Sequence, residues 1–275
     1  MDDYSQGCRL PADVWAEFNR RIVFERPELR RFAAPFPPRE LMRNVSGLEV
    51  ERDFAAHGAH FWDVFSRLLP RPLADYRDIL DFGCGCGRLA RMFKGHPGKV
   101  RACDIDPRHI EWVQRNLDFV DAVLTEPNRP LPFAEASFDL IIAVSVLTHV
   151  DEPTQDRLLE ELRRVARPGG TVLITTHGAR ALQRAIDEER IFRMLDVPSA
   201  ALRQAAASFE SGRHSFICQQ GHLTSADFRY GITFVPERHV RTRWSAMLDV
   251  KQVAGGGIHD FQDVVVLNRR ASERD

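Results

Sequence analysis

Three glycines at two-residue spacing follow an apolar segment and have the composition of a nucleotide-binding turn. Gly83, Gly85 and Gly87 stand in this turn, and Asp81 lies just before them. Glycine permits positive φ and lets a ligand approach the backbone closely. A second carboxylate, Asp104, follows Gly87 by 17 residues at the end of the next apolar segment. A carboxylate in that place can accept hydrogen bonds from both ribose hydroxyls of a nucleoside. These residues predict a site for a nucleoside-containing cofactor.

The glycine spacing bears on which cofactor this is. In the dinucleotide fingerprint the third glycine comes three residues after the second, whereas here Gly87 comes two residues after Gly85 and Arg88 follows it. The spacing disfavours an NAD-dependent oxidoreductase, which is kept as the alternative from another enzyme class.

Strand and helix patterns alternate from residue 78 onward and must position these residues. Short apolar segments alternate with helical ones, and Pro107 opens one helix while the run from Arg167 to Gly170 ends another. Such alternation predicts right-handed βαβ units and an α/β fold with a mostly parallel, Rossmann-like sheet of seven strands, covered by helices on both faces. The expected strands are 78–82, 99–103, 119–124, 138–144, 171–176, 247–253 and 261–267; helices are expected after Gly87 and at 107–117, 153–166 and 236–244.

Two segments fall outside this alternation. Residues 1–47 predict an N-terminal helical cap, with helices at 11–21 and 38–45, and a further helix is expected at 49–69. We assign residues 48–275 to the main domain. Within it, residues 178–235 begin as a helix (179–194) and then become polar and mixed. This insertion follows the fifth strand, at the carboxyl edge of the sheet, where it can cover a substrate as a lid.

Four motifs in order resemble one enzyme family. They are Asp81-Phe-Gly-Cys-Gly-Cys-Gly-Arg88, Asp104-Ile-Asp-Pro107, Leu131-Pro-Phe-Ala-Glu-Ala-Ser-Phe-Asp139 and Leu158-Leu-Glu-Glu-Leu-Arg-Arg-Val-Ala-Arg-Pro-Gly-Gly170. The set is similar to class I S-adenosylmethionine-dependent methyltransferases, in particular those of bacterial glycan and natural-product pathways. The resemblance covers residues 48–177 well and 236–270 less closely.

This resemblance implies the contacts of S-adenosylmethionine and of the product S-adenosylhomocysteine. Asp81 lies near the methionine ammonium, Asp104 holds the ribose hydroxyls, and the glycines line the amino-acid and ribose parts. Relatives often carry an Asp where this chain has Pro127, so Glu126 or a backbone group is expected at the adenine. The remaining implied cofactor contacts are Cys84, Ile105, Thr125, Val144 and Ser145.

Histidines at strand ends are the candidate catalytic residues. An alcohol acceptor benefits from a general base with a pKa near working pH, for which histidine is the usual choice. His149 follows the fourth strand and His177 ends the fifth, while Tyr230 in the insertion could position a substrate. Each has a structural alternative: a hydrogen-bonding residue, a hinge residue and a packed aromatic, respectively. His214 and His222 also lie in the insertion.

Composition narrows the partners and the compartment. The 38 Lys and Arg residues nearly cancel the 39 Asp and Glu residues, for a net charge of −1, which disfavours nucleic acid as a substrate. The start of the chain is polar and no apolar run is long enough to span a bilayer, so we expect a cytoplasmic protein without membrane contact. Five cysteines at irregular spacing predict no disulfide framework. Cys84 and Cys86 are not followed by a second pair at zinc-ligand spacing, so no metal site is expected.

The leading hypothesis is therefore methyl transfer from S-adenosylmethionine to a small molecule, with O-methylation of a sugar or secondary-metabolite hydroxyl favoured. N- or C-methylation stays open because the fold does not determine the acceptor. A non-catalytic S-adenosylmethionine-binding protein is the third hypothesis.

Overall fold

The computed structural model describes residues 3–219 and 229–271. Its larger sheet has seven strands in the order β3-β2-β1-β4-β5-β9-β8, and β6 pairs with β7 in a second sheet. The chain divides into two compact units, unit 1 (Met1–Thr125) and unit 2 (Glu126–Asp275). The strand bounds are β1 Asp78–Phe82, β2 Lys99–Asp104, β3 Val120–Leu124, β4 Phe138–Ala143, β5 Ala166–His177, β6 Ser215–Cys218, β7 Gly231–Phe234, β8 Asp249–Ile258 and β9 Gln262–Asn268.

In unit 1, parallel pairing brings the two predicted cofactor carboxylates to one edge of the sheet. β1 pairs with β2, so that Asp81 lies opposite Ala102, and β2 pairs with β3. The carboxyl ends of parallel strands share an edge. α5 (Pro107–Asn116) follows β2, and the Asp106 side chain caps it by accepting from the Arg108 N–H. Proline at the first helical position behind an aspartate cap is the favoured start of a helix.

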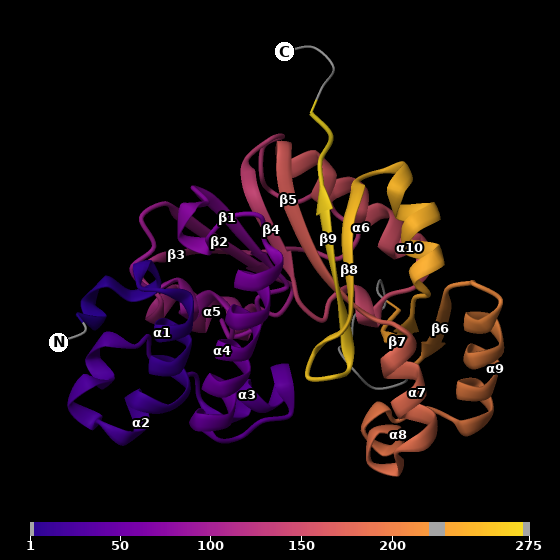
Figure 1. Cartoon of the computed structure of the whole chain (residues 1–275), viewed down its shortest axis with the longest axis horizontal. Coiled ribbons are helices and arrows are strands. Elements are labelled where there is room, and N and C mark those ends of the chain that lie inside the picture. The colour runs from indigo at the N-terminus through magenta and orange to yellow at the C-terminus, as the bar shows by residue number, and fades with distance from the viewer. Residues whose placement is uncertain (1–2, 220–228, 272–275) are drawn as a thin grey trace. The chain divides into compact units, whose positions relative to one another are not determined.

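The N-terminal part of unit 1 is a series of short helices. The last of the short helices before the longer helix α4 is α3, which lies beside α4 (Figure 1). α4 buries a wide face that includes Phe54, Phe61 and Phe65. The helices here are η1 Tyr4–Arg9, α1 Ala12–Glu17, the π-helical turn η2 Phe18–Ile22, α2 Val23–Glu25, η3 Pro27–Phe32, α3 Arg39–Ser46, α4 Glu51–Leu68 and η4 Leu73–Asp75.

The α-helix expected after Gly87 is absent from the structure, and that expectation is wrong. The segment forms turns and a short 3₁₀ helix, η5 (Ala90–Phe93). Its carbonyls bind the N-terminal region instead of continuing a helix: Trp15 Nε1 donates to Met92 O at 2.7 Å and the Cys8 N–H donates to Lys94 O at 2.9 Å. The tertiary partners therefore take the acceptors that an α-helix would need.

Unit 2 contains the other four strands of the larger sheet. β4 and β5 are parallel, whereas β5, β9 and β8 pair antiparallel, and Figure 1 shows β8 and β9 as neighbouring long strands beside β5. β5 begins earlier than predicted because the backbone of Gly169 and Gly170 pairs with Arg269. The helices here are η6 Leu147–His149, α6 Glu152–Val165, α10 Glu237–Arg243 and η7 Trp244–Ala246.

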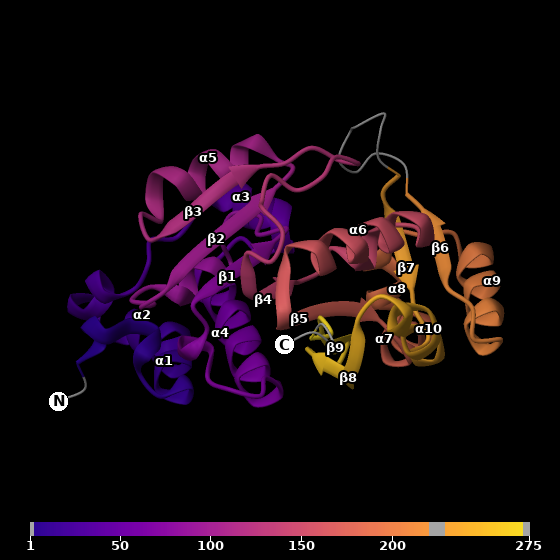
Figure 2. The same ribbon diagram turned by 90° about the horizontal axis from the view of Figure 1, so that it is seen from above.

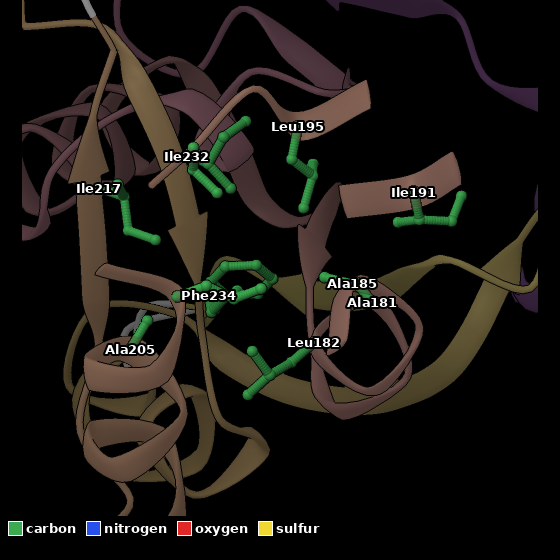
Figure 3. Packing of buried hydrophobic residues seen from close by; sticks show 11 residues of the cluster. Ala181, Leu182, Ala185, Ile191, Leu195, Ala205, Ile217, Ile232 and Phe234 are labelled. Atoms are coloured by element: carbon green, nitrogen blue, oxygen red, sulfur yellow. The ribbon is translucent and has the colours of Figure 1, made fainter. Parts of the chain in front are cut away.

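The insertion after β5 has its own apolar core. Two helices, α7 (Ala179–Asp187) and α8 (Glu189–Leu195), replace the single helix expected at 179–194, because Glu188 between them is extended. α9 (Ser199–Glu210) and the pair β6–β7, which lie side by side in Figure 2, were not predicted. Figure 3 shows Phe234 of β7 pointing toward Ala181 and Leu182 of α7. The insertion, whose sequence is polar and mixed in composition after its first helical part, therefore folds into a subdomain with an apolar core.

All five cysteines of the chain lie among the described residues, and all are free thiols. Within residues 3–219 and 229–271, no helix combines the length and apolar character needed to cross a membrane.

Candidate functional site

The glycine turn of unit 1 adopts a backbone that its residue types make possible. Gly83, Gly85 and Gly87 all have positive φ, at 72°, 52° and 82°. The N–H groups of Gly83 and Cys84 both donate to Cys103 O, at 2.8 and 3.0 Å. The turn is therefore held against the end of β2, and left-handed residues in it favour glycine.

Asp104 connects the two predicted halves of the cofactor site. Its Oδ2 accepts from the Gly85 N–H at 2.8 Å, and its Oδ1 accepts from the Asp106 N–H at 2.9 Å. A carboxylate has about four lone-pair positions, so each oxygen keeps capacity for a further donor such as a ribose hydroxyl. Asp104 both fixes the glycine turn and carries the acceptor atoms that a nucleoside needs.

Asp81 is a buried carboxylate that lacks a counter-charge in direct contact. It is 2% exposed, and its Oδ2 has no hydrogen-bond partner among the described residues. Burial, together with the nearby charge of Asp104, raises the pKa of Asp81 to about 7. Arg88, whose guanidinium lies 4.7 Å from the centre of the Phe61 ring, opposes this shift through its charge. An unsatisfied buried carboxylate is expected to gain strongly from a cationic donor.

These residues fit S-adenosylmethionine. The cofactor carries an ammonium group, for which the orphaned Asp81 Oδ2 is a partner, and a ribose, for which Asp104 is a partner. The remaining unit 1 residues implied as contacts follow the ends of β1, β2 and β3. Cys84 is buried, Ile105 and Thr125 are half-buried, and the Thr125 N–H donates to Asp104 O at 2.9 Å. Glu126, in unit 2, is exposed and pairs with Arg129 at 3.8 Å.

The three predicted catalytic residues come together in unit 2. The rings of His149 and Tyr230 stack with centroids 4.6 Å apart, and the rings of His149 and His177 meet edge to face at 6.2 Å. His222, also noted in the sequence, lies outside the described residues. The cluster thus joins η6, the end of β5 and the start of β7.

Strand β7 sets the tautomer of both histidines. His149 Nδ1 lies 2.9 Å from Gly231 O, and His177 Nδ1 lies 3.1 Å from Thr233 O. A carbonyl oxygen only accepts, so each Nδ1 carries the proton and each Nε2 carries the lone pair. Burial, with the nearby His149, lowers the pKa of His177 to about 3, so His177 stays neutral. Burial raises the pKa of Tyr230 to about 12, which keeps its phenol protonated.

A polar pair that the sequence did not reveal lies at the strand ends of the same unit. Ser145 follows β4 with a φ of 58°, a left-handed backbone that is unusual for serine. Its N–H donates to Thr175 Oγ1 at 2.8 Å, and its hydroxyl lies within hydrogen-bond distance of the Gln262 side-chain amide, 2.9 Å from Nε2. Val144, the other predicted contact here, is half-buried.

Gln262 and Thr175 could not be identified from local sequence. β9 pairs antiparallel with β5 so that Gln262 faces His177, and that register depends on residues some 85 positions apart in the chain. The polar run Thr175-Thr-His177 at the end of β5 indicated a site at this strand end, but it did not indicate which residue Thr175 binds.

Known proteins resemble this chain in sequence and in fold. Residues 80–174 match the family described as a methyltransferase domain. Among solved structures, the PH0226 protein from Pyrococcus horikoshii superimposes with a TM-score of 0.54 at 15% identity, covering 75% of this chain and 88% of that one. This likeness confirms the predicted fold class.

The curated relatives are methyltransferases that are named for different acceptors. A malonyl-[acyl-carrier protein] O-methyltransferase from Serratia marcescens is 28% identical over 155 residues, which cover 54% of this chain and 58% of the relative. A tRNA N(3)-cytidine methyltransferase from Gallus gallus is 28% identical over 120 residues, covering 40% of this chain and 32% of the relative. The chain matches between 48% and 62% of the length of the first three curated relatives.

The match over residues 80–174 and the seven-stranded fold are similar to those of class I S-adenosylmethionine-dependent methyltransferases. Residues 80–174 are the part of the chain that matches the methyltransferase-domain family. The family match and the curated relatives support the predicted enzyme class and its cofactor, S-adenosylmethionine with S-adenosylhomocysteine as product.

Proposed function

We propose that this chain transfers the methyl group of S-adenosylmethionine to a hydroxyl oxygen of a small polar acceptor. The observation that carries the proposal is the tautomer of His149. Because its Nδ1 donates to Gly231 O at 2.9 Å, its Nε2 holds the lone pair that can accept a proton. A hydroxyl must lose its proton when it is methylated, so it gains from such a base.

The residues of unit 1 bind the donor in this proposal. Asp81 holds the methionine ammonium and Asp104 holds the ribose, while the backbone of Gly83, Gly85 and Gly87 keeps the turn open to the ligand. When bound, S-adenosylmethionine supplies an electrophilic methyl group on a sulfonium.

The residues of unit 2 bind and deprotonate the acceptor. The aromatic face of Tyr230 supplies apolar contact, and Ser145 with Gln262 supplies hydrogen bonds. His149 accepts the hydroxyl proton at Nε2. His177, with its low pKa, stays neutral and supports the ring of His149 at 6.2 Å. The segment 1–47 is assigned as a cap.

Charge and thiol content support a small acceptor in a reducing compartment. The net charge of −1 lacks the basic excess that tRNA binding uses. The free cysteines are in keeping with a cytoplasmic protein. The relative named for malonyl-[acyl-carrier protein] supports oxygen as the accepting atom, but a carboxylate is already ionised and needs no base, so the histidine favours a hydroxyl.

The test is S-adenosylhomocysteine formation with defined acceptors: methyl α-D-glucopyranoside and catechol as hydroxyl acceptors, malonyl-coenzyme A as a carboxylate, and unfractionated tRNA. We expect turnover with a hydroxyl acceptor, and a fall of about 10²–10⁴-fold in kcat for His149→Gln with unchanged cofactor affinity. Turnover confined to the carboxylate or to tRNA, or a His149→Gln variant as active as the parent, would contradict the proposal.

A further inference from the structure

Val45 of helix α3, in unit 1, contacts Gly85, the middle glycine of the glycine turn. A Cβ placed on Gly85 would lie 2.6 Å from Val45 Cγ2 and 2.9 Å from Val45 Cγ1. The face of Gly85 that lacks a side chain is therefore covered by Val45. Alanine at position 85 would collide with this valine, so the close approach is a property of this pair.

The covered face borders the ribose-binding carboxylate. The Gly85 N–H donates to Asp104 Oδ2 at 2.8 Å, so a ribose bound to Asp104 would lie next to Gly85. Val45 therefore covers the residue beside which that ribose would lie.

Helix α3 is weakly attached to unit 1. Of its eight residues, Arg39–Ser46, only Met42 is buried. Its ion pairs, from Arg39 and Arg43 to Glu49, join exposed side chains, and such pairs contribute little to stability. A helix that buries one side chain is expected to open at low free-energy cost.

The surroundings of α3 allow it to move. Its last residue is followed by Gly47, which has a φ of 69° and an open space where a side chain would be. Leu41 of α3 lines a groove together with residues of α5 that include Trp112. Val45, Leu41 and Trp112 all pack on the small buried cluster of Met42, Phe54 and Cys86. A displacement of α3 would therefore change the environment of Trp112.

We propose that α3 is part of the cofactor site, with Val45 covering Gly85 in the free protein and α3 moving off the glycine turn when S-adenosylmethionine binds or S-adenosylhomocysteine leaves. This inference rests on the cofactor site assigned above. It adds to that site a residue that lies outside the 80–174 segment matched by the methyltransferase family. Val45 is thus a gating residue, whose side chain slows association of the cofactor.

The test is stopped-flow binding of S-adenosylhomocysteine to the full chain, followed by tryptophan fluorescence. Val45→Ala removes two methyl groups from the contact, and we expect the association rate constant to rise about three- to tenfold. Val50→Ala makes the same chemical change at a residue that is 55% exposed, and it should leave the rate unchanged. The fluorescence signal should be strongly reduced in Trp112→Phe.

The results of this experiment distinguish a failure of the proposed cofactor site from a failure of the proposed α3 gate. If the parent protein binds no S-adenosylhomocysteine, the cofactor site itself is wrong. If the parent binds it and Val45→Ala associates at the same rate or more slowly, α3 is a fixed packing element and the gate is overturned. Glu49→Gln, which weakens the ion pairs of α3, replaces Val45→Ala if that variant does not fold, and a faster association is again the supporting result.

Discussion

The ring of Tyr230 stacks on the ring of His149, with centroids 4.6 Å apart and planes 11° apart. The two residues lie 81 positions apart in the chain, and β7 holds both because Gly231 O accepts from His149 Nδ1. The residue that immediately follows Tyr230 thus fixes the tautomer of the histidine against which Tyr230 packs. The end of the insertion and the proposed base form one structural element.

Asp104→Ala should weaken S-adenosylhomocysteine binding by about 1–3 kcal/mol, or about 5- to 150-fold. The variant loses the acceptor for ribose and also the hydrogen bond at 2.8 Å that fixes Gly85. Isothermal titration calorimetry measures the change. Asp121→Ala removes an exposed carboxylate of β3 and serves as the matched control, with affinity expected to stay at the parental value. Equal affinities for both variants would remove Asp104 from the site.

Cofactor affinity should rise as pH increases from about 6 to about 8. Burial raises the pKa of Asp81 to about 7, so its carboxyl is mostly protonated at the lower pH and mostly ionised at the higher one. The ionised form attracts the methionine ammonium, and binding at about pH 6 should therefore release a proton. Calorimetry in buffers of different ionisation enthalpy measures that release. Asp81→Asn should abolish it, and a release that persists in this variant would assign the titration to another group.

Phe234→Ala should destabilise the protein by about 3–5 kcal/mol, because it opens a cavity in the core of the insertion. Phe234 is fully buried among residues of α7, α8, α9 and β6 (Figure 3). Urea unfolding followed by circular dichroism gives the free energy of unfolding. Ile186→Ala, at a residue of α7 that is 54% exposed, should change it by less than about 0.5 kcal/mol. Similar losses for the two variants would contradict the packing described for this core.

Local sequence signals predicted the parallel strands and the helices α5 and α6 well. β1 occupies the expected residues 78–82, and α5 begins at the expected Pro107 because its aspartate cap and proline act within three residues. The positions of Asp81 and Asp104, the carboxylates proposed to bind the cofactor, could also be predicted, since each lies at or next to the end of an apolar strand. Such features depend on neighbours in the chain.

Features that depend on distant residues could not be predicted in this way. The segment after Gly87 has a helical composition, but Trp15 and Cys8 bind the carbonyls that a helix needs. The contact of Val45 with Gly85, the pairing of Ser145 with Gln262 and the strand pair β6–β7 all require tertiary structure to be known first.

Binding of S-adenosylmethionine by the glycine turn is the step on which both proposals depend. It is measured by calorimetric titration of the purified full chain with S-adenosylhomocysteine, and in parallel with NADH. We expect saturable binding of one S-adenosylhomocysteine per chain and no heat of binding with NADH. Saturable binding of NADH, or no binding of S-adenosylhomocysteine, would contradict it.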